Sequence, residues 1–572
     1  MITLNSIENT NIPTLTIIGL SKDNKPVDEV ENRVITNGSV FEEIDTGNTY
    51  LFDYQNKVWV QQKSNEGNFE ILEKLNQKVD KVSGKGLSSN DFTNELKQKL
   101  DDIDLSEYAK KSEVNDSLNN KVNKVEGKDL STNDFTNEYK QIIDGLNLNN
   151  QSDILGLCVD YENKTFARLA GATNLTAGTD FDKFPMYGNR KRCNVLDDGT
   201  ITAYYGDENY TEDGSNGQVM VYQPKFYYKV VPLKLEPIDT GIGYHLRKAN
   251  YYISAYPYEG FKLHPAFYDG NKNEVDYVLI GAYEGSIYDT SESSYLLHDE
   301  QVMAVGEDKF CSIAGVKPAS GFTQNLTRPN VETLAQNRGS NWHGSTIKIA
   351  SMNQLLCMIE MGTMNFQSAI GQGVVSYASG NGNEASNTGA TSSLGNGTGQ
   401  ATQTTHISSD GTETIDTTSG KLSVSYRGLE NPWGNIWEFE YGVNIWGNGN
   451  MAGGQPYVAD DFNFAESKRT DNYEGAGFTV AHVGGYISAM GYSTRCDWLF
   501  MASETAGNSS LPVGDLTYVT PNLNEYRIVR LGGGWNERTG AGGFCWVLHT
   551  GVGWHIQYLG GRLVYVPTAT VI

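Results

Sequence analysis

The chain has 572 residues and a formal net charge of −25. This length exceeds what one hydrophobic core supports, so several domains are expected. The acidic balance argues against binding to a nucleic-acid backbone, which needs a basic face. No apolar run reaches the length of a membrane-spanning helix and no secretory signal is visible, so we expect folding in the cytoplasm and no membrane insertion.

Glycine is abundant (62 residues) and tyrosine (33) outnumbers phenylalanine (20), which favours many turns, short strands and a wet aromatic surface. The cysteines are scattered, with no CxxC pair and no His/Cys spacing that suits zinc. We therefore expect free, mostly buried thiols at positions 158, 193, 311, 357, 496 and 545.

Residues 1–69 are predicted to form a small β unit that attaches the chain to a tail or baseplate. Apolar, β-branched runs at 14–20, 33–45 and 48–62 are separated by turn signals such as Asn37-Gly38.

Residues 70–150 contain a repeat with a period of 43 residues, in which 79–103 recurs as 122–146 with 16 of 25 positions identical. Its apolar residues recur at helical spacing, and the helices they predict are too short to be stable alone. We expect a coiled-coil-like stalk in which three copies associate; a flexible charged linker is the alternative. The residues predicted to associate are Leu75, Val79, Val82, Phe92, Leu96, Leu118, Val122, Val125 and Phe135.

From residue 151 helical periodicity fades while glycine and aromatic residues increase, which predicts a large head, 151–572. Strands are expected at 219–233, 251–261 and 275–289, and helices at 331–339 and 349–366. The segment 376–420 is low-complexity Gly/Ser/Thr/Asn sequence, and we expect a long exposed loop that buries no core.

Three C-terminal motifs occur in a fixed order: GNIWEF at 434–439, RLGGGW at 530–535 and GGRLV at 560–564. They resemble the G-N-V-W-E-W, R-G-G-S-W and G-F-R-L signatures of the formylglycine-generating-enzyme version of the C-type lectin fold. The repeat, 197–230 and 338–374 resemble phage tail fibres and receptor-binding tail proteins. The resemblance implies a mainly β chain with a C-type-lectin-like α+β head, in which Trp437, Trp535 and Arg562 have structural roles.

No enzymatic activity is expected. Formylglycine-generating enzymes use a pair of cysteines between the second and third motifs, but the segment 536–559 holds only Cys545. No catalytic residue is therefore assigned. Asp and Glu are not paired as in glycosidases, no metal ligand set is evident, and no cofactor is expected, calcium being possible but unsupported.

The resemblance places the ligand-binding surface in the C-terminal part of the head. Aromatic faces stack on sugar CH groups and polar side chains fix hydroxyls, while Trp and Arg also anchor protein interfaces. A glycan and a protein receptor both stay open, and strand alternation should bury about half of the candidates. The candidate binding residues are Asn536, Arg538, Trp546, His549, Trp554, His555 and Tyr558.

These observations predict a homotrimeric phage tail fibre that sits in the virion and attaches to the host-cell surface through a lectin-like head. Two alternatives stay open: a glycan-degrading tailspike enzyme, and a diversified ligand-binding surface protein of prophage origin.

Overall fold

The computed structural model describes residues 3–8, 14–31, 33–61, 151–299, 304–322, 326–378, 382–408, 410–447, 454–466, 468–519 and 524–569. The chain divides into two compact units, residues 1–128 and 129–572. The residues predicted to associate in the stalk, from Leu75 to Phe135, lie outside the described residues, so the coiled coil and the trimer stay predictions. None of the helices in the described ranges has the length and hydropathy of a membrane span.

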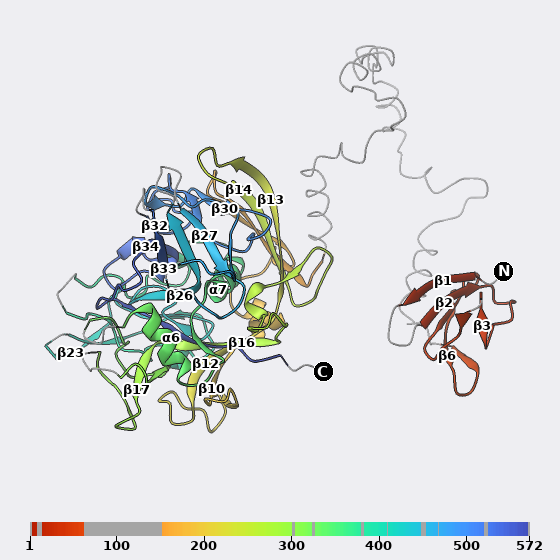
Figure 1. Ribbon diagram of the computed structural model, residues 1–572, viewed down its shortest axis with the longest axis horizontal. Helices are drawn as coiled ribbons and strands as arrows, with labels where there is room; N and C mark the ends of the chain where they lie inside the picture. The colour runs from red at the N-terminus through yellow and green to blue at the C-terminus, as the bar shows by residue number, and fades with distance from the viewer. Residues whose placement is uncertain are drawn as a thin grey trace, which may run out of the picture. The chain divides into compact units, whose positions relative to one another are not determined.

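The first unit is built on one five-stranded sheet in the order β1-β2-β5-β6-β7, with a small hairpin beside it (Figure 1). Only the β2–β5 pair is parallel. One face of the sheet is buried, because alternate residues of β5 and β6 point into a small core around Ile17, Phe41 and Phe52. The strands are β1 (Thr3–Glu8), β2 (Thr14–Gly19), β3 (Glu29–Val30), β4 (Arg33–Val34), β5 (Val40–Glu43), β6 (Thr49–Asp53) and β7 (Val58–Gln61).

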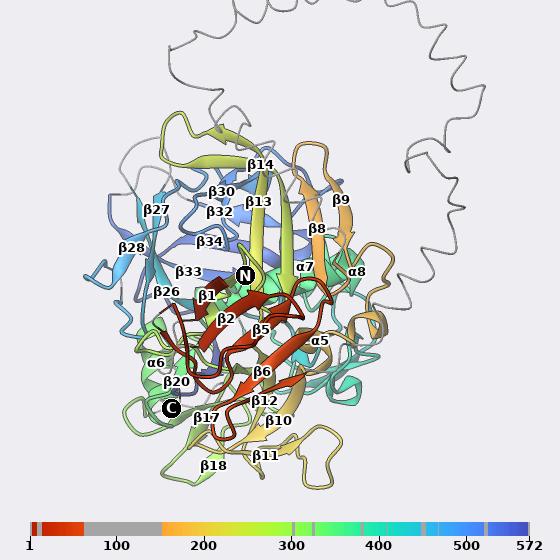
Figure 2. The same cartoon turned by 90° about the vertical axis from the view of Figure 1, so that its right-hand side faces the viewer.

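The second unit is mainly β, with three large sheets and few helices. In the first sheet, the long hairpin β13–β14 continues into β8 and β9, and these four strands run side by side (Figure 2). Its strands are β8 (Ile154–Asp160), β9 (Thr165–Ala170), β13 (Tyr227–Pro237), β14 (Tyr244–Ser254), β15 (Lys262–Leu263), β30 (Ala489–Tyr492) and β31 (Ala502–Glu504).

The second sheet has the order β11-β10-β12-β16-β36-β20 and is antiparallel throughout. It joins β36 to segments more than 200 residues earlier, so this C-terminal strand is held between β16 and β20. Its strands are β10 (Lys191–Val195), β11 (Ile201–Tyr204), β12 (Gln218–Pro224), β16 (Tyr277–Glu284), β20 (Trp342–Gly344) and β36 (Arg562–Tyr565).

The third sheet has the order β28-β27-β26-β33-β34-β32-β29, with β35 parallel to β26. It carries the first two C-terminal motifs, because β26 starts at Trp437 and β33 ends at Gly532. Its strands are β26 (Trp437–Gly447), β27 (Gly454–Ala459), β28 (Tyr473–Gly475), β29 (Gly485–Tyr486), β32 (Leu516–Tyr518), β33 (Tyr526–Gly532), β34 (Gly542–Thr550) and β35 (Leu559–Gly560).

Helix α7 (Ile347–Met361) is the central helix of the head and contacts both β26 and β8. Thr346 caps its start by accepting from the Ile349 N–H, and Gly362 ends it in the left-handed conformation. Twelve of its fifteen residues are buried, as expected for a helix that is apolar on nearly every side. Among the described residues the other α-helices are α5 (Pro185–Gly188), α6 (Arg328–Gln336) and α8 (Phe366–Ala369). The helices predicted at 331–339 and 349–366 correspond to α6 and α7, with bounds shifted by two to five residues.

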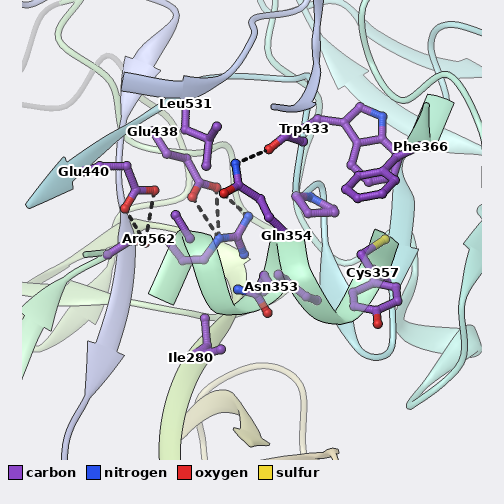
Figure 3. A pocket seen from close by; sticks show the side chains of 16 residues that line it. Ile280, Asn353, Gln354, Cys357, Phe366, Trp433, Glu438, Glu440, Leu531 and Arg562 are labelled. Carbon is purple, nitrogen blue, oxygen red and sulfur yellow. Dashed lines mark hydrogen bonds and ion pairs between the residues drawn. The ribbon is translucent and has the colours of Figure 1, made fainter. Parts of the chain in front are cut away.

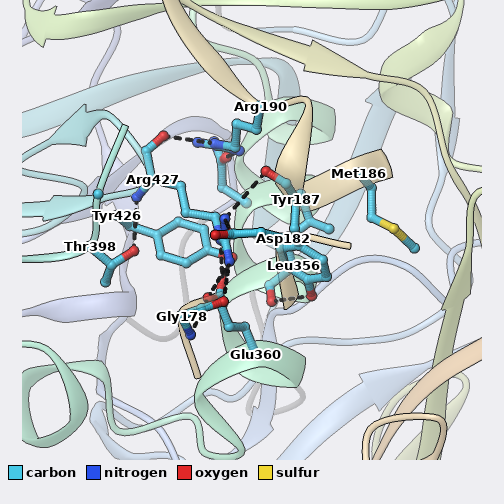
Figure 4. A network of polar contacts seen from close by, with 12 residues as sticks. Gly178, Asp182, Met186, Tyr187, Arg190, Leu356, Glu360, Thr398, Tyr426 and Arg427 are labelled. Atoms are coloured by element: carbon cyan, nitrogen blue, oxygen red, sulfur yellow. Dashed lines mark hydrogen bonds and ion pairs between the residues drawn. The ribbon is translucent and has the colours of Figure 1, made fainter. Parts of the chain in front are cut away.

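A buried ion pair fastens α7 to the chain on either side of it (Figure 4). Arg427 donates to both carboxylate oxygens of Glu360, at 2.7 Å each, and Glu360 also accepts from the Gly178 N–H and the Tyr426 hydroxyl. Arg427 makes a second ion pair with Asp182 at 2.8 Å. Residues from three separate parts of the sequence therefore meet around one fully buried carboxylate.

The low-complexity segment 376–420 is not the exposed loop that its composition predicts. It forms β21 (Gly399–Gln400), β22 (Thr404–Ile407) and β23 (Glu413–Asp416), and it buries Asn383, Ser386 and Thr391 completely. Further small strands lie around it: β17 (Ser286–Asp289), β18 (Ser294–Tyr295), β19 (Lys309–Cys311), β24 (Val424–Tyr426) and β25 (Leu429–Glu430).

The physical reason is hydrogen bonding rather than apolar burial. The Thr391 hydroxyl donates to Glu430 at 2.7 Å, and the Ser386 N–H donates to the Asn435 side chain at 2.7 Å. Asn383 donates to Asp299. Side-chain and backbone donors of the segment are thus paired with buried acceptors of the body, which offsets part of the cost of burying polar groups.

Candidate functional site

The three C-terminal motifs converge on one buried ion pair. Arg562 of the third motif donates to Glu438 of the first at 2.6 and 2.9 Å, and to the backbone carbonyls of Gly281 and Glu430. Glu438 lies opposite Leu531 of the second motif in the β26–β33 pairing. Arg562 thereby ties three strands together.

Both predicted structural tryptophans are buried as well. Trp437 and Trp535 are each 1% exposed. The Arg530 guanidinium lies over the Trp437 ring at 4.9 Å, and Tyr558 meets Trp535 edge-on at 5.8 Å. The two buried rings give the loops that follow β33 and β34 an apolar surface to pack against.

Of the candidate binding residues, Trp546 is in the core. It is fully buried in β34, and its indole N–H donates to the Phe500 carbonyl at 2.8 Å. This placement corrects the prediction that Trp546 contacts a ligand, because its face of β34 packs against the interior. His549, on the opposite face of the same strand, is half-buried, and burial lowers its pKa below the ordinary value.

Trp554 and His555 lie on a surface loop that follows β34. Trp554 is 50% exposed, and His555 Nδ1 lies 2.9 Å from the Gly321 carbonyl oxygen. Gly321 is required here, since a Cβ would collide with the Ile556 backbone. Phe322, next in the chain, is also exposed, at 38%.

The remaining candidates are Arg538, Asn536 and Tyr558. Arg538 is exposed on the turn after Trp535, with a left-handed backbone (φ 52°), and its N–H donates to the Val375 carbonyl. Asn536 is half-buried on the same turn. Tyr558 is half-buried, with the Arg530 guanidinium 5.9 Å from its ring.

A groove of ≈ 630 Å³ opens where the low-complexity segment meets the loop after β18. Its lining is mainly amide, hydroxyl and imidazole groups, with apolar Leu297 (52% exposed) at the surface. The polar lining includes His298, Asn387, Thr388, Gln403, Thr405 and Glu413.

The segment 314–322 connects the groove to the aromatic loop. Gly315 lines the groove, and the Lys317 ammonium donates to the carbonyls of Asn383 and Ile407 in the low-complexity segment. Seven residues after Gly315, Phe322 flanks the contact with His555. Sequence reasoning missed Phe322 and the groove, because no local pattern relates residues 297, 322 and 387.

In its described residues, the head contains no pair of bonded cysteines of the kind that paired-thiol chemistry would use. All six cysteines are free, and Cys545 is fully buried with its pKa raised well above the ordinary value by that burial. Such a thiol stays protonated and is not a nucleophile. Within the described ranges, no three His, Cys, Asp or Glu side chains group as a metal site requires.

Comparison with known proteins gives little more. No protein-family model and no curated protein matches the chain. Two solved structures, the P3c and U1 variants of the Major Tropism Determinant, align over 93% of this chain and 94% of their own, at 10% identity and a TM-score of 0.21. That TM-score does not establish a common fold.

Proposed function

We propose that the chain is a phage tail fibre whose head attaches the virion to a receptor on the host-cell surface, with glycan as the expected ligand. Two features of the head carry the proposal: the exposed rings of Trp554 and Phe322, and a groove whose polar lining includes Asn387 and Gln403. Aromatic rings beside amide and hydroxyl groups suit sugars, which present CH faces and hydroxyls together.

The predictions made from the sequence of the N-terminal part of the chain agree with this proposal. The repeat at 79–146 would make a short trimeric stalk, and residues 1–69 would dock on the tail. A trimer presents three heads, so a weak single site gains through multivalency.

The test is adsorption of the labelled full-length chain to a panel of bacterial strains and to their purified wall glycans. Trp554→Ala should weaken adsorption about tenfold or more, as loss of an aromatic anchor does. Tyr256→Ala is the matched control, since Tyr256 is 55% exposed and belongs to the loop after β14. Adsorption that Tyr256→Ala and Trp554→Ala weaken equally, or no adsorption to any strain, would contradict the proposal.

A further inference from the structure

A cavity of ≈ 40 Å³ lies inside the head between α7 and β26 (Figure 3). Gln354 and Cys357 of α7 line one side, and Glu438 and Glu440 of β26 line the other. Most of its lining is buried, and it belongs neither to the exposed aromatic loop nor to the surface groove.

The donors along its wall are already used by protein acceptors. Arg562 donates to Glu438 and to three backbone carbonyls, and the Tyr426 hydroxyl donates to Glu360. The Gln354 amide nitrogen donates to the Gly543 carbonyl at 2.7 Å.

Two acceptors in the wall are left short of donors. Gln354 is 3% exposed, and its Oε1 has no donor among the described residues. Flipping the amide does not help, because Oε1 would then face the Gly543 carbonyl oxygen. The Glu440 carboxyl, 1% exposed, has only the Ser345 hydroxyl, at 3.0 and 3.2 Å. A buried acceptor without a donor costs about 1–3 kcal/mol.

We propose that this cavity binds a cluster of about three water molecules, which donate to Gln354 Oε1 and bridge it to the Glu440 carboxyl. Water fits in size, since each molecule needs about 10–15 Å³ of such space. Water also fits chemically, because it can donate hydrogen bonds to Gln354 Oε1 and the Glu440 carboxyl and can accept hydrogen bonds as well. The cluster joins the central helix to the central strand of the third sheet, so it is part of the head's structure.

Glu440 completes the network as a neutral acid. Burial, together with the neighbouring Glu438 carboxylate, raises the pKa of Glu440 well above its ordinary value, while Ser345 and Arg562 oppose the shift. A protonated Glu440 can donate into the cluster. A bound metal ion is disfavoured because the Arg562 guanidinium already balances Glu438 and repels a second cation nearby.

The test is a high-resolution crystal structure of the full-length chain, with and without xenon pressure. We expect water density bonded to Gln354 Oε1 and no xenon, because polar cavities hold water and apolar ones take up xenon. Xenon in the cavity, or no density there, would overturn the proposal.

A second measurement separates water from a cation. Glu440→Gln keeps the shape and supplies a neutral donor, so its melting temperature at pH 7 should stay within about 2 °C of the parent. Calcium, magnesium or a chelator should leave the parent unchanged. A calcium- or magnesium-dependent rise in melting temperature that Glu440→Gln removes would assign the cavity to a metal ion instead. Glu438→Gln is the control for a damaged site, since it removes the partner of Arg562 and should lower the melting temperature.

Discussion

The buried pair Arg427–Glu360 gives the sharpest test of how the head is held together. Glu360→Gln keeps the size of the side chain but removes the charge that both 2.7 Å bonds from Arg427 rely on. Glu360 is fully buried and Arg427 is 6% exposed, so water does not replace the lost partner. Breaking a buried pair by removing one member costs about 3–5 kcal/mol.

The second ion pair reduces this loss. Asp182 stays 2.8 Å from Arg427, but its side chain is 51% exposed and therefore screened. We expect a loss near the lower end, about 3 kcal/mol, which is roughly a hundredfold in the unfolding equilibrium. Urea unfolding of the full-length chain measures it as a lower midpoint of the head transition at an unchanged m-value.

Two variants control for trivial effects. Glu236→Gln removes an exposed partner of Arg247 and should change stability by less than about 0.5 kcal/mol. Replacing Arg427 by Met in the Glu360→Gln background removes the stranded charge and should recover part of the loss. A Glu360→Gln loss below about 1 kcal/mol would refute the reasoning, because that is the size of a solvent-screened surface pair.

Three further predictions concern other parts of the chain. Phe92→Asp with Phe135→Asp should convert a trimer into monomers with a folded head, measured by light scattering and near-UV circular dichroism; a variant that stays trimeric places assembly elsewhere. Burial raises the pKa of Asp515 to about 8, so its contribution to stability is complete below pH 4 and is lost as pH rises toward 8, by about 1.4 kcal/mol per pH unit. Asp515→Asn should flatten that decline in urea unfolding at pH 5–8, and an unchanged slope contradicts the assignment. Trp546→Phe should lower the melting temperature through its lost bond to Phe500 yet leave adsorption per folded molecule unchanged; reduced adsorption would return Trp546 to the binding residues.

Periodic apolar patterns were enough to predict α6, α7 and several strands of the head. The stripe Ile349, Met352, Leu355, Leu356 and Ile359 belongs to α7, and all five side chains are buried. The run 219–233 divides into β12 and β13. These elements follow from local spacing, because their apolar residues recur at helical or strand intervals.

The low-complexity segment could not be predicted in the same way. Its burial depends on partners such as Glu430, Asn435 and Asp299, which are distant in sequence. Alternation predicts that about half of the candidates are buried, but β34 is buried on both faces, with eight of its nine residues buried, so Trp546 was wrongly placed at the surface. β34 is an inner strand of the third sheet, because it pairs with both β33 and β32.

The central claim is that the face around Trp554 binds the host surface. Adsorption of full-length Trp554→Ala to host cells, compared with Tyr256→Ala at equal melting temperature, tests it most directly. Trp554→Ala is expected to lose about tenfold or more in affinity, while Tyr256→Ala should keep the parent value. Full adsorption by a folded Trp554→Ala variant would contradict it and would move the binding site elsewhere on the chain.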